Sequence, residues 1–428
     1  MRARQNKVRL LAAISAAALL VAACGSDDEE SDGTAAASTA APAATEAPAV
    51  TDAPADTEAP VDTSAGSIVE AGGSGLTVDV AQCTKPEGAD VKLQLQWFTQ
   101  AQFGGYFAAV EQGFFEEEGL NVEIVEGGVD IPPQRQVATG AVDFAISWVP
   151  KALAEREAGA KVTNIAQIFQ RSGTLQVSFK DTGIESVEDF AGKKIGNWGF
   201  GNEFEIFAAL TEAGLDPATD VELLQQNFDM NGLLSGDIDA AEAMTYNEYA
   251  QVLEAVNPDT GELYTPEDLN VISYEEVGVG MLQDAIFADQ EKLSDPAYCG
   301  QAIALVKGAI KGWVYCRDNA EACRDIVVEK GSTLGASHQL WQMNEVNKLI
   351  WPAEGGIGVI DEAAWARTVE IATGTKNLEG GTVLTKPVDP EAYTNDIVNE
   401  AISQLGDEVD VNGADFEPID VTLEEGGV

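Results

Sequence analysis

The sequence of 428 residues contains one histidine, His338, and only 24 basic residues against 72 acidic ones. A single histidine excludes a zinc site with two histidine ligands and leaves almost no room for a histidine-based catalytic triad. The formal net charge of −48 opposes binding to nucleic acids and to anionic lipid surfaces. Hydrophobic residues still make up 45% of the chain, so a packed core is expected and disorder throughout is excluded.

Motifs for catalysis and metal binding are also missing from the sequence, which has no GxSxG, Walker or calcium-loop pattern. His338 lies in a predicted late helix, far from the candidate site, and is interpreted as a structural or surface residue. A carboxylate pair such as Glu203 with Asp229 is conceivable for hydrolysis, but nothing in the sequence marks either group as an acid with a shifted pKa. No catalytic residue, metal or cofactor is predicted.

The N-terminus has the features of an export signal. Residues 2–9 are basic, and residues 10–23 form an apolar run that is too short to span a membrane comfortably but suits a signal-peptide core. Small residues precede Cys24, as in a bacterial lipobox, so residues 1–23 are predicted to be removed and Cys24 to be lipidated. Residues 24–86, rich in Ala, Thr, Pro and acids, predict a disordered tether. We therefore expect an extracytoplasmic protein anchored to the cell membrane.

Four further cysteines, Cys83, Cys299, Cys316 and Cys323, fit export. Outside the cytosol they favour disulfides, for which three connectivities exist. Cys316 and Cys323 flank a short segment expected to turn between helices, so this pair is favoured, and Cys83 with Cys299 remains. The alternative, a metal site with four cysteine ligands, lacks paired CxxC spacing.

From residue 87 onward, predicted strands and helices alternate. Strands are expected at 92–97, 122–125, 142–147, 164–169, 194–197, 221–225 and 240–244, and helices at 104–118, 132–139, 150–158, 203–213, 232–235 and 246–256. Repeated β-α-β units predict an α/β fold with mostly parallel sheets flanked by helices. Two series of units predict two lobes. We expect the first part of lobe 1 at 87–182, lobe 2 at 183–283, the return to lobe 1 with C-terminal helices at 284–406, and an acidic tail at 407–428.

Six successive predicted strand ends carry aromatic or amide side chains. In open α/β sheets, ligands bind beyond the carboxyl ends of the strands. Aromatic rings can sandwich a planar heterocycle, while amides and carboxylates match its ring nitrogens or an exocyclic amine. Each aromatic residue alone is as well explained by core packing, but their coincidence favours a ligand site.

Several segments resemble solute-binding proteins of ABC importers in the sulfonate and thiamine-pyrimidine-precursor group. They are WFTQAQFGGYFAAVEQGFFEEEGLNVEI (97–124), GAVDFAISW (140–148) and DFAGKKIG (189–196). The resemblance implies a type II periplasmic-binding-protein fold whose two lobes close on a ligand, a monomer, and delivery of the ligand to an ABC permease in the membrane. Within the group, FQRSG (169–173), GNEFEIFAAL (201–210) and AMTYNEYAQVLE (243–254) look most like binders of thiamine pyrimidine precursors and of riboflavin.

The resemblance also implies roles for individual residues. The ligand ring would stack on or lie against Trp97, Trp148 and Trp198, and one side of the site would be closed by Gln102 and Tyr106. The amine or ring nitrogens of the ligand would bond to Glu203 and Asp229. Its polar substituents would be reached from the hinge side by Arg171, Tyr246 and Asn247.

The alternatives are a secreted enzyme acting on a small heterocycle and a binder of an alkanesulfonate. The eukaryotic enzyme that makes the thiamine pyrimidine resembles this chain, but it relies on a histidine and a cysteine-rich iron-binding motif. No His or Cys lies between Cys83 and Cys299, so an enzyme is not predicted. A sulfonate would favour clusters of Arg or Ser. The sequence does not choose between riboflavin and a thiamine pyrimidine.

Overall fold

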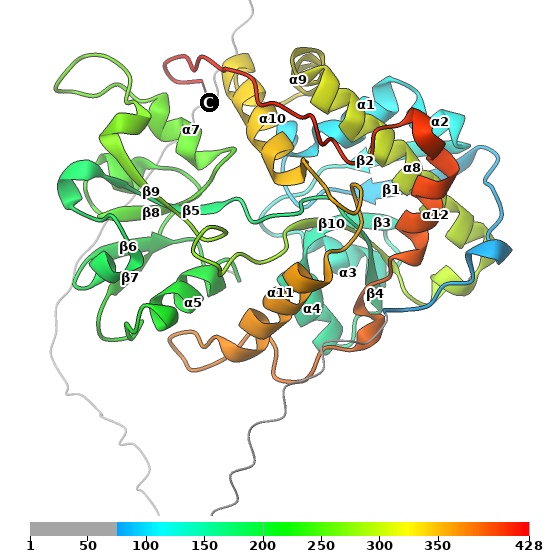
Figure 1. The fold of residues 1–428 in the computed structure, drawn as a ribbon, viewed down its shortest axis with the longest axis horizontal. Helices are drawn as coiled ribbons and strands as arrows, with labels where there is room; N and C mark the ends of the chain where they lie inside the picture. Colours follow the sequence, from blue (N-terminus) through cyan, green and yellow to red (C-terminus); the bar gives the residue numbers. More distant parts are fainter. Residues whose placement is uncertain (1–74, 200, 428) are drawn as a thin grey trace, which may run out of the picture. The chain divides into compact units, whose positions relative to one another are not determined.

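The computed structural model describes residues 75–199 and 201–427. This part of the chain contains two five-stranded sheets flanked by helices (Figure 1). The predicted signal peptide, Cys24 and the tether up to residue 74 lie outside the described residues. Within the described ranges, no helix combines the length and the apolar character needed to cross a membrane.

The first sheet has the strand order β2-β1-β3-β10-β4. Its strands are β1 (Ala89–Gln94), β2 (Leu120–Val125), β3 (Phe144–Trp148), β4 (Val162–Gln167) and β10 (Asp284–Asp289). β1 pairs in parallel with β2 and β3, whereas β10 runs antiparallel to both β3 and β4. The central strand β3 has a buried run, Phe144 to Ser147, as expected for a strand covered on both faces.

The second sheet has the corresponding order β7-β6-β8-β5-β9. Its strands are β5 (Thr174–Phe179), β6 (Lys194–Asn197), β7 (Glu222–Gln225), β8 (Ala240–Met244) and β9 (Leu269–Ser273). Here β5 is the antiparallel member, paired with β8 and β9. Each sheet is therefore mixed but mostly parallel, and the predicted fold class is confirmed.

Strands β5, β9 and β10 were not predicted from the sequence, and the first crossing between the lobes lies earlier than predicted. β5 already belongs to the second sheet, so the chain crosses at 168–173 and not at 183. The β-α-β pattern could not reveal β5 and β10, because an antiparallel strand needs no helical crossover before it. The return crossing ends at Asp284, the first residue of β10 and the first residue of the predicted return.

Twelve α-helices are described around the sheets. They are α1 (Gly104–Glu111), α2 (Phe114–Glu117), α3 (Pro133–Ala138), α4 (Val149–Glu157), α5 (Phe204–Glu212), α6 (Asn231–Leu234), α7 (Glu248–Leu253), α8 (Pro296–Asp318), α9 (Ala320–Glu329), α10 (Ala336–Ile350), α11 (Glu362–Gly374) and α12 (Asp396–Leu405). The helix predicted at 104–118 is split into α1 and α2, because Gly113 between them adopts a left-handed φ of 75°.

The long helix α8 organises the helical layer beside the first sheet. It begins with Pro296 at its first turn, and the Asp295 side chain accepts the N–H groups of Ala297 and Tyr298 at 2.9 and 3.0 Å. It packs against α1, α2 and α12. Its Lys307 donates to buried Glu118 at 2.5 Å, so this carboxylate is neutralised inside the packed layer.

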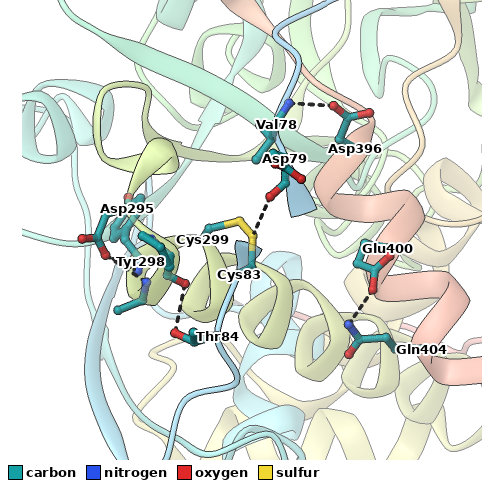
Figure 2. Close-up of a disulfide and its surroundings, with 12 residues drawn as sticks. Val78, Asp79, Cys83, Thr84, Asp295, Tyr298, Cys299, Asp396, Glu400 and Gln404 are labelled. Carbon is teal, nitrogen blue, oxygen red and sulfur yellow. Dashed lines mark hydrogen bonds between the residues drawn. A yellow bond between two sulfur atoms is a disulfide. The ribbon is translucent and has the colours of Figure 1, made fainter. Parts of the chain in front are cut away.

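The described start of the chain is packed on the body, which corrects the predicted extent of the tether. The Val78 N–H donates to the Asp396 carboxylate at 2.7 Å, and Cys83 is bonded to Cys299 of α8 (Figure 2). The composition of residues 75–86 alone predicts that they belong to the tether. However, Val78 and Cys83 in this segment contact residues far along the chain. Composition alone cannot predict such long-range contacts.

The C-terminal segment predicted as an acidic tail lacks regular structure over 409–427 but is also tied to the body. Ile357 donates its N–H to the Val411 carbonyl at 2.8 Å, and Ile419 donates to the Asn344 side chain at 2.9 Å. Near its end, Gly426 donates to the Glu254 carbonyl at 3.1 Å. The segment therefore runs along the folded body.

The two disulfides, Cys83–Cys299 and Cys316–Cys323, should contribute unequally to stability. They close loops of very different length, with sequence separations of 216 and 7 residues. The chain-entropy model then assigns about 5 kcal/mol to the first and about 2 kcal/mol to the second. Urea unfolding of C83A/C299A should show the larger loss, with C316A/C323A as the matched control. Equal losses would mean that loop entropy does not govern their effect.

Candidate ligand-binding cleft

A cavity of about 640 Å³ lies at the strand ends of the two sheets. Its volume is in the range of small-molecule sites. The first sheet and its connections contribute Gln96, Trp97, Gln100, Gln102, Gln134, Arg135, Ser147, Trp148 and Lys151, and the second contributes Trp198, Asn202, Phe204, Phe228, Met244, Tyr246, Asn247 and Glu248. The lining therefore combines aromatic rings with side-chain amides.

Three aromatic rings form a continuous wall that joins the two sheets. The Phe228 ring lies 5.0 Å from the Trp97 ring in an edge-on arrangement and 6.0 Å from the Trp198 ring in a stacked one. Trp97 follows β1 of the first sheet, while Phe228 and Trp198 follow β7 and β6 of the second. The wall therefore offers flat apolar surface to a ligand that contacts both sheets at once.

Beside this wall, amides and an indole surround a buried carboxylate. Asp284, only 1% exposed, accepts the Trp148 Nε1–H at 2.8 Å and the Gln102 Nε2–H at 3.0 Å, and also accepts from Gln96 Nε2. Burial raises the pKa of the Asp284 carboxyl to about 7, although these hydrogen bonds and the nearby Lys151 oppose the shift.

Lys151 is a basic residue of the cavity lining that interacts electrostatically with carboxylates of the cleft. Its Nζ lies 4.8 Å from the centre of the Trp148 ring. Burial lowers the pKa of Lys151 to about 8, against the attraction of Glu242, Asp284 and Glu203. Burial also raises the pKa of Glu242, whose Oε2 accepts the backbone N–H of Trp198 at 2.7 Å and whose Oε1 has no partner among the described residues. The cleft therefore holds groups that change protonation near neutral pH.

Six of the ten residues proposed from the sequence line this cavity. They are Trp97, Gln102, Trp148, Trp198, Tyr246 and Asn247. They come from four different strand-end segments, so the structure brings together side chains up to 150 positions apart in the sequence. The strand-end rule thus locates the cleft from both sheets.

Tyr106 and Arg171 do not line the cavity. Tyr106 is buried in the core, with its ring 5.7 Å from that of Trp313. The Arg171 guanidinium donates to the carbonyls of residues 348, 349, 351 and 352, with the shortest contact, to Pro352, at 2.7 Å. Arg171 therefore holds the end of α10 and does not face a ligand.

Glu203 and Asp229 are also outside the lining and bond to their own loops. Glu203 Oε2 accepts the N–H of Gly201 at 2.9 Å, and Asp229 Oδ1 accepts the N–H of Asn231 at 2.9 Å. Both are short-range contacts of the type that acidic residues make at turns and helix starts. The two carboxylates therefore stabilise loops beside the cleft. Polar side chains such as Gln96 and Gln102 line the cavity instead.

His338 is structural, as predicted, but it is fully buried and lies just behind the cleft. Its Nδ1 is 3.0 Å from Glu254 Oε2, and its Nε2 is 3.0 Å from Asn247 Oδ1. Asn247 lines the cavity. The expectation that this histidine lies far from the strand ends is therefore wrong, because α10 packs against the loop that follows β8.

Other residues that line or support the cavity were not predicted from the sequence, although some had a signal. Phe228 stands in the loop after β7, which the strand-end rule had already marked. Asp284 is a carboxylate in the apolar run MLQDAIFA, an unusual position for an unpaired acid. Gln96, Gln134 and Lys151 carry no comparable signal. Across the described chain, no group of His, Cys, Asp and Glu side chains is arranged to hold a metal ion.

The fold is that of two-lobed periplasmic binding proteins. A Methylobacillus flagellatus structure, named as the sulfonate-binding protein of a sulfonate ABC transporter, superposes with a TM-score of 0.54. The identity is 17%, and the match covers 79% of this chain and 99% of that one. At this identity the likeness concerns the fold alone.

The chain belongs to the NMT1/THI5-like family, whose model matches residues 100–322. It is 24% identical over 243 residues to the formylaminopyrimidine-binding protein of Halalkalibacterium halodurans, covering 56% of this chain and 69% of that protein. It is 24% identical over 340 residues to the riboflavin-binding protein RibY of Chloroflexus aurantiacus, covering 75% and 90%.

A Haemophilus influenzae protein named for thiamine biosynthesis is 26% identical over 188 residues, which is 44% of this chain. The match spans 60% of the length of that protein.

Replacing Arg171 with Ala should destabilise the fold. Removing the guanidinium leaves carbonyls at the end of α10 without their donor, and hydrogen bonds to a charged group contribute about 1.5–3 kcal/mol. Chemical denaturation should show a loss in this range. The control is Lys330→Ala, which breaks a surface pair with Glu111 and should cost less than about 1 kcal/mol. Equal effects would contradict the role given to Arg171.

Proposed function

We propose that this chain is the substrate-binding protein of an ABC importer and captures a planar nitrogen heterocycle, a thiamine pyrimidine precursor or riboflavin. It would be held outside the cytoplasm by a lipid on Cys24 and would deliver the ligand to a membrane permease. The observation that carries the proposal is the aromatic wall of Trp97, Phe228 and Trp198, contributed by both sheets next to side-chain amides.

The chemistry of the lining supports this ligand class. A planar ring placed against the wall gains apolar contact with Trp97 and Trp198, and amides at its edge satisfy ring nitrogens and exocyclic groups. A ligand touching both sheets would also hold the two lobes together, which is how binding would favour a closed form. Two relatives with substantial coverage are named for binding formylaminopyrimidine and riboflavin, both planar nitrogen heterocycles.

The lining is less suited to a sulfonate. Among the described residues that line the cavity, the basic ones are Arg135 and Lys151. Arg135 is already paired with Glu155 at 2.5 Å, so its guanidinium is not free for an anion. A sulfonate prefers charge-assisted hydrogen bonds from arginine. We therefore place the alkanesulfonate alternative second.

Replacing Trp97 with Ala should weaken heterocycle binding. Losing one aromatic anchor typically costs about 2 kcal/mol, which is roughly 30-fold in Kd. The measurement is calorimetry on the full chain with riboflavin, formylaminopyrimidine and an alkanesulfonate as separate probes. The matched control is Tyr264→Ala, since Tyr264 packs its ring on Phe179 in the second sheet and does not line the cavity.

Binding should also stabilise the wild-type fold, by about 2.7 kcal/mol at 100 times the Kd. Absence of binding by either heterocycle would overturn the proposed ligand class, and saturable binding of the sulfonate alone would favour the second candidate. Chemical turnover of a heterocycle in the same assay would indicate an enzyme.

A further inference from the structure

Asp284 occupies a position that no other carboxylate of the cleft shares. It is the first residue of β10, at the point where the chain returns to the first sheet, and it lies opposite Trp148, the last residue of β3. It is buried and does not itself line the cavity, yet the three side chains that donate to it all do. Asp284 therefore acts on the cleft through Gln96, Gln102 and Trp148.

An ionised carboxylate accepts hydrogen bonds and donates none, so it determines which way the amides around it point. Gln96 and Gln102 must turn their Nε2 groups toward Asp284. Gln102 then presents its Oε1 to Gln100, which donates its own Nε2 at 2.7 Å. The orientation of the three amides, Gln96, Gln102 and Gln100, therefore follows from the Asp284 carboxylate.

The consequence is a cleft edge that offers acceptors. Gln96 and Gln100 each engage one N–H of the amide nitrogen, and their Oε1 atoms have no hydrogen-bond partner among the described residues. Neither oxygen is one of the fully buried polar atoms that lack a partner, so neither is sealed inside the core. Since both residues line the cavity, two amide oxygens are available to a ligand.

The geometry points to Asp284 as a positioning residue that accepts one N–H each from Gln96, Gln102 and Trp148, so that the cleft presents the carbonyl oxygens of Gln96 and Gln100 to N–H groups of the ligand. The inference rests on the proposed function and specifies it. The ligand is one whose ring or amine N–H faces this edge. A ligand that presents only acceptors to these two oxygens binds more weakly, because two acceptors cannot pair.

The arrangement also implies a pH dependence. The groups that face Asp284 are Lys151 from α4, Tyr106 from α1, and Tyr246 after β8. Burial holds the pKa of both tyrosines well above 10, so they stay neutral, and the pKa of Lys151 near 8 keeps it mostly charged at neutral pH. Because the pKa of Asp284 is about 7, acidification protonates it, removes an acceptor and frees an amide to rotate. Affinity should therefore fall as the pH drops below about 7.

The test is Asp284→Asn in the full chain, titrated with riboflavin and with formylaminopyrimidine from pH 5.5 to 8.5. Wild-type affinity should fall below pH 7 by at most tenfold per pH unit, as for one linked proton. D284N should bind at least tenfold more weakly at pH 8 and should lose the fall in affinity below pH 7. Any titration of the ligand itself would remain in D284N and is thereby separated.

Glu205→Gln is the matched control. Glu205 is also buried, with a pKa that burial raises to about 7, and it accepts the Met281 N–H at 2.5 Å without bonding to a cavity-lining residue. This variant should keep both the affinity and the pH profile of the wild type. A flattened profile in E205Q with an unchanged one in D284N would overturn the assignment.

Gln96→Leu tests the same inference if D284N folds poorly. This variant removes the Oε1 acceptor of Gln96, a half-buried residue, and should weaken riboflavin binding at least tenfold. It should make little difference to a riboflavin analogue methylated at its ring N–H, which the wild type should already bind weakly. Equal binding of both flavins by the wild type would overturn the inference while leaving the proposed function standing. Failure of the wild type to bind any heterocycle would instead overturn the proposed function.

Discussion

The cleft depends on how the chain crosses between its two sheets. One crossing, at 168–173, leads from β4 to β5, and the other returns from β9 to β10. The Gln283 side chain ties them together, since its Oε1 accepts the Gly173 N–H at 2.9 Å and its Nε2 donates to Thr174 Oγ1 at 2.8 Å. Glu275 adds a bond from the Ser172 N–H at 2.9 Å. These bonds satisfy backbone N–H groups of the crossing, which have no partner within either sheet. They also tie the two crossings together, so that the strand ends of both sheets lie around one cavity.

The buried acids at the cleft are satisfied mainly by hydrogen bonds, in a chain with few bases. The strongly held bases satisfy other groups, such as Lys307 on Glu118 and Arg171 on the end of α10. Around the cavity, Asp284, Glu242 and Glu248 instead accept N–H groups from side chains and backbone. Such bonds offset desolvation only partly, so burial raises the pKa of each of these carboxyl groups.

The sequence predicts the class of the fold well, because hydrophobic periodicity and helical crossovers are local signals. It also predicts the side chains that end or follow parallel strands, such as Trp97, Trp148 and Trp198. It predicts poorly where a residue's role is set by a distant partner. Arg171 stands directly beside a strand end, yet the carbonyls that attract it lie about 180 positions away. His338 is distant in sequence from every strand end, yet the packing of α10 brings it against Asn247.

Asp284 shows that the first residue of an antiparallel strand can also lie at the cleft. The strand-end rule considers the last residues of parallel strands, and Asp284 is the first residue of a strand. Because β10 runs antiparallel to β3, its first residue pairs with Trp148, the last residue of β3. The second sheet repeats the geometry, since Thr174 begins the antiparallel strand β5 and pairs with Met244 at the end of β8. In a two-lobed fold of this kind, the chain therefore enters each antiparallel strand at the cleft, directly after a crossing. A polar residue that begins such a strand in an otherwise apolar run is then as strong a candidate for shaping the site as one that ends a parallel strand.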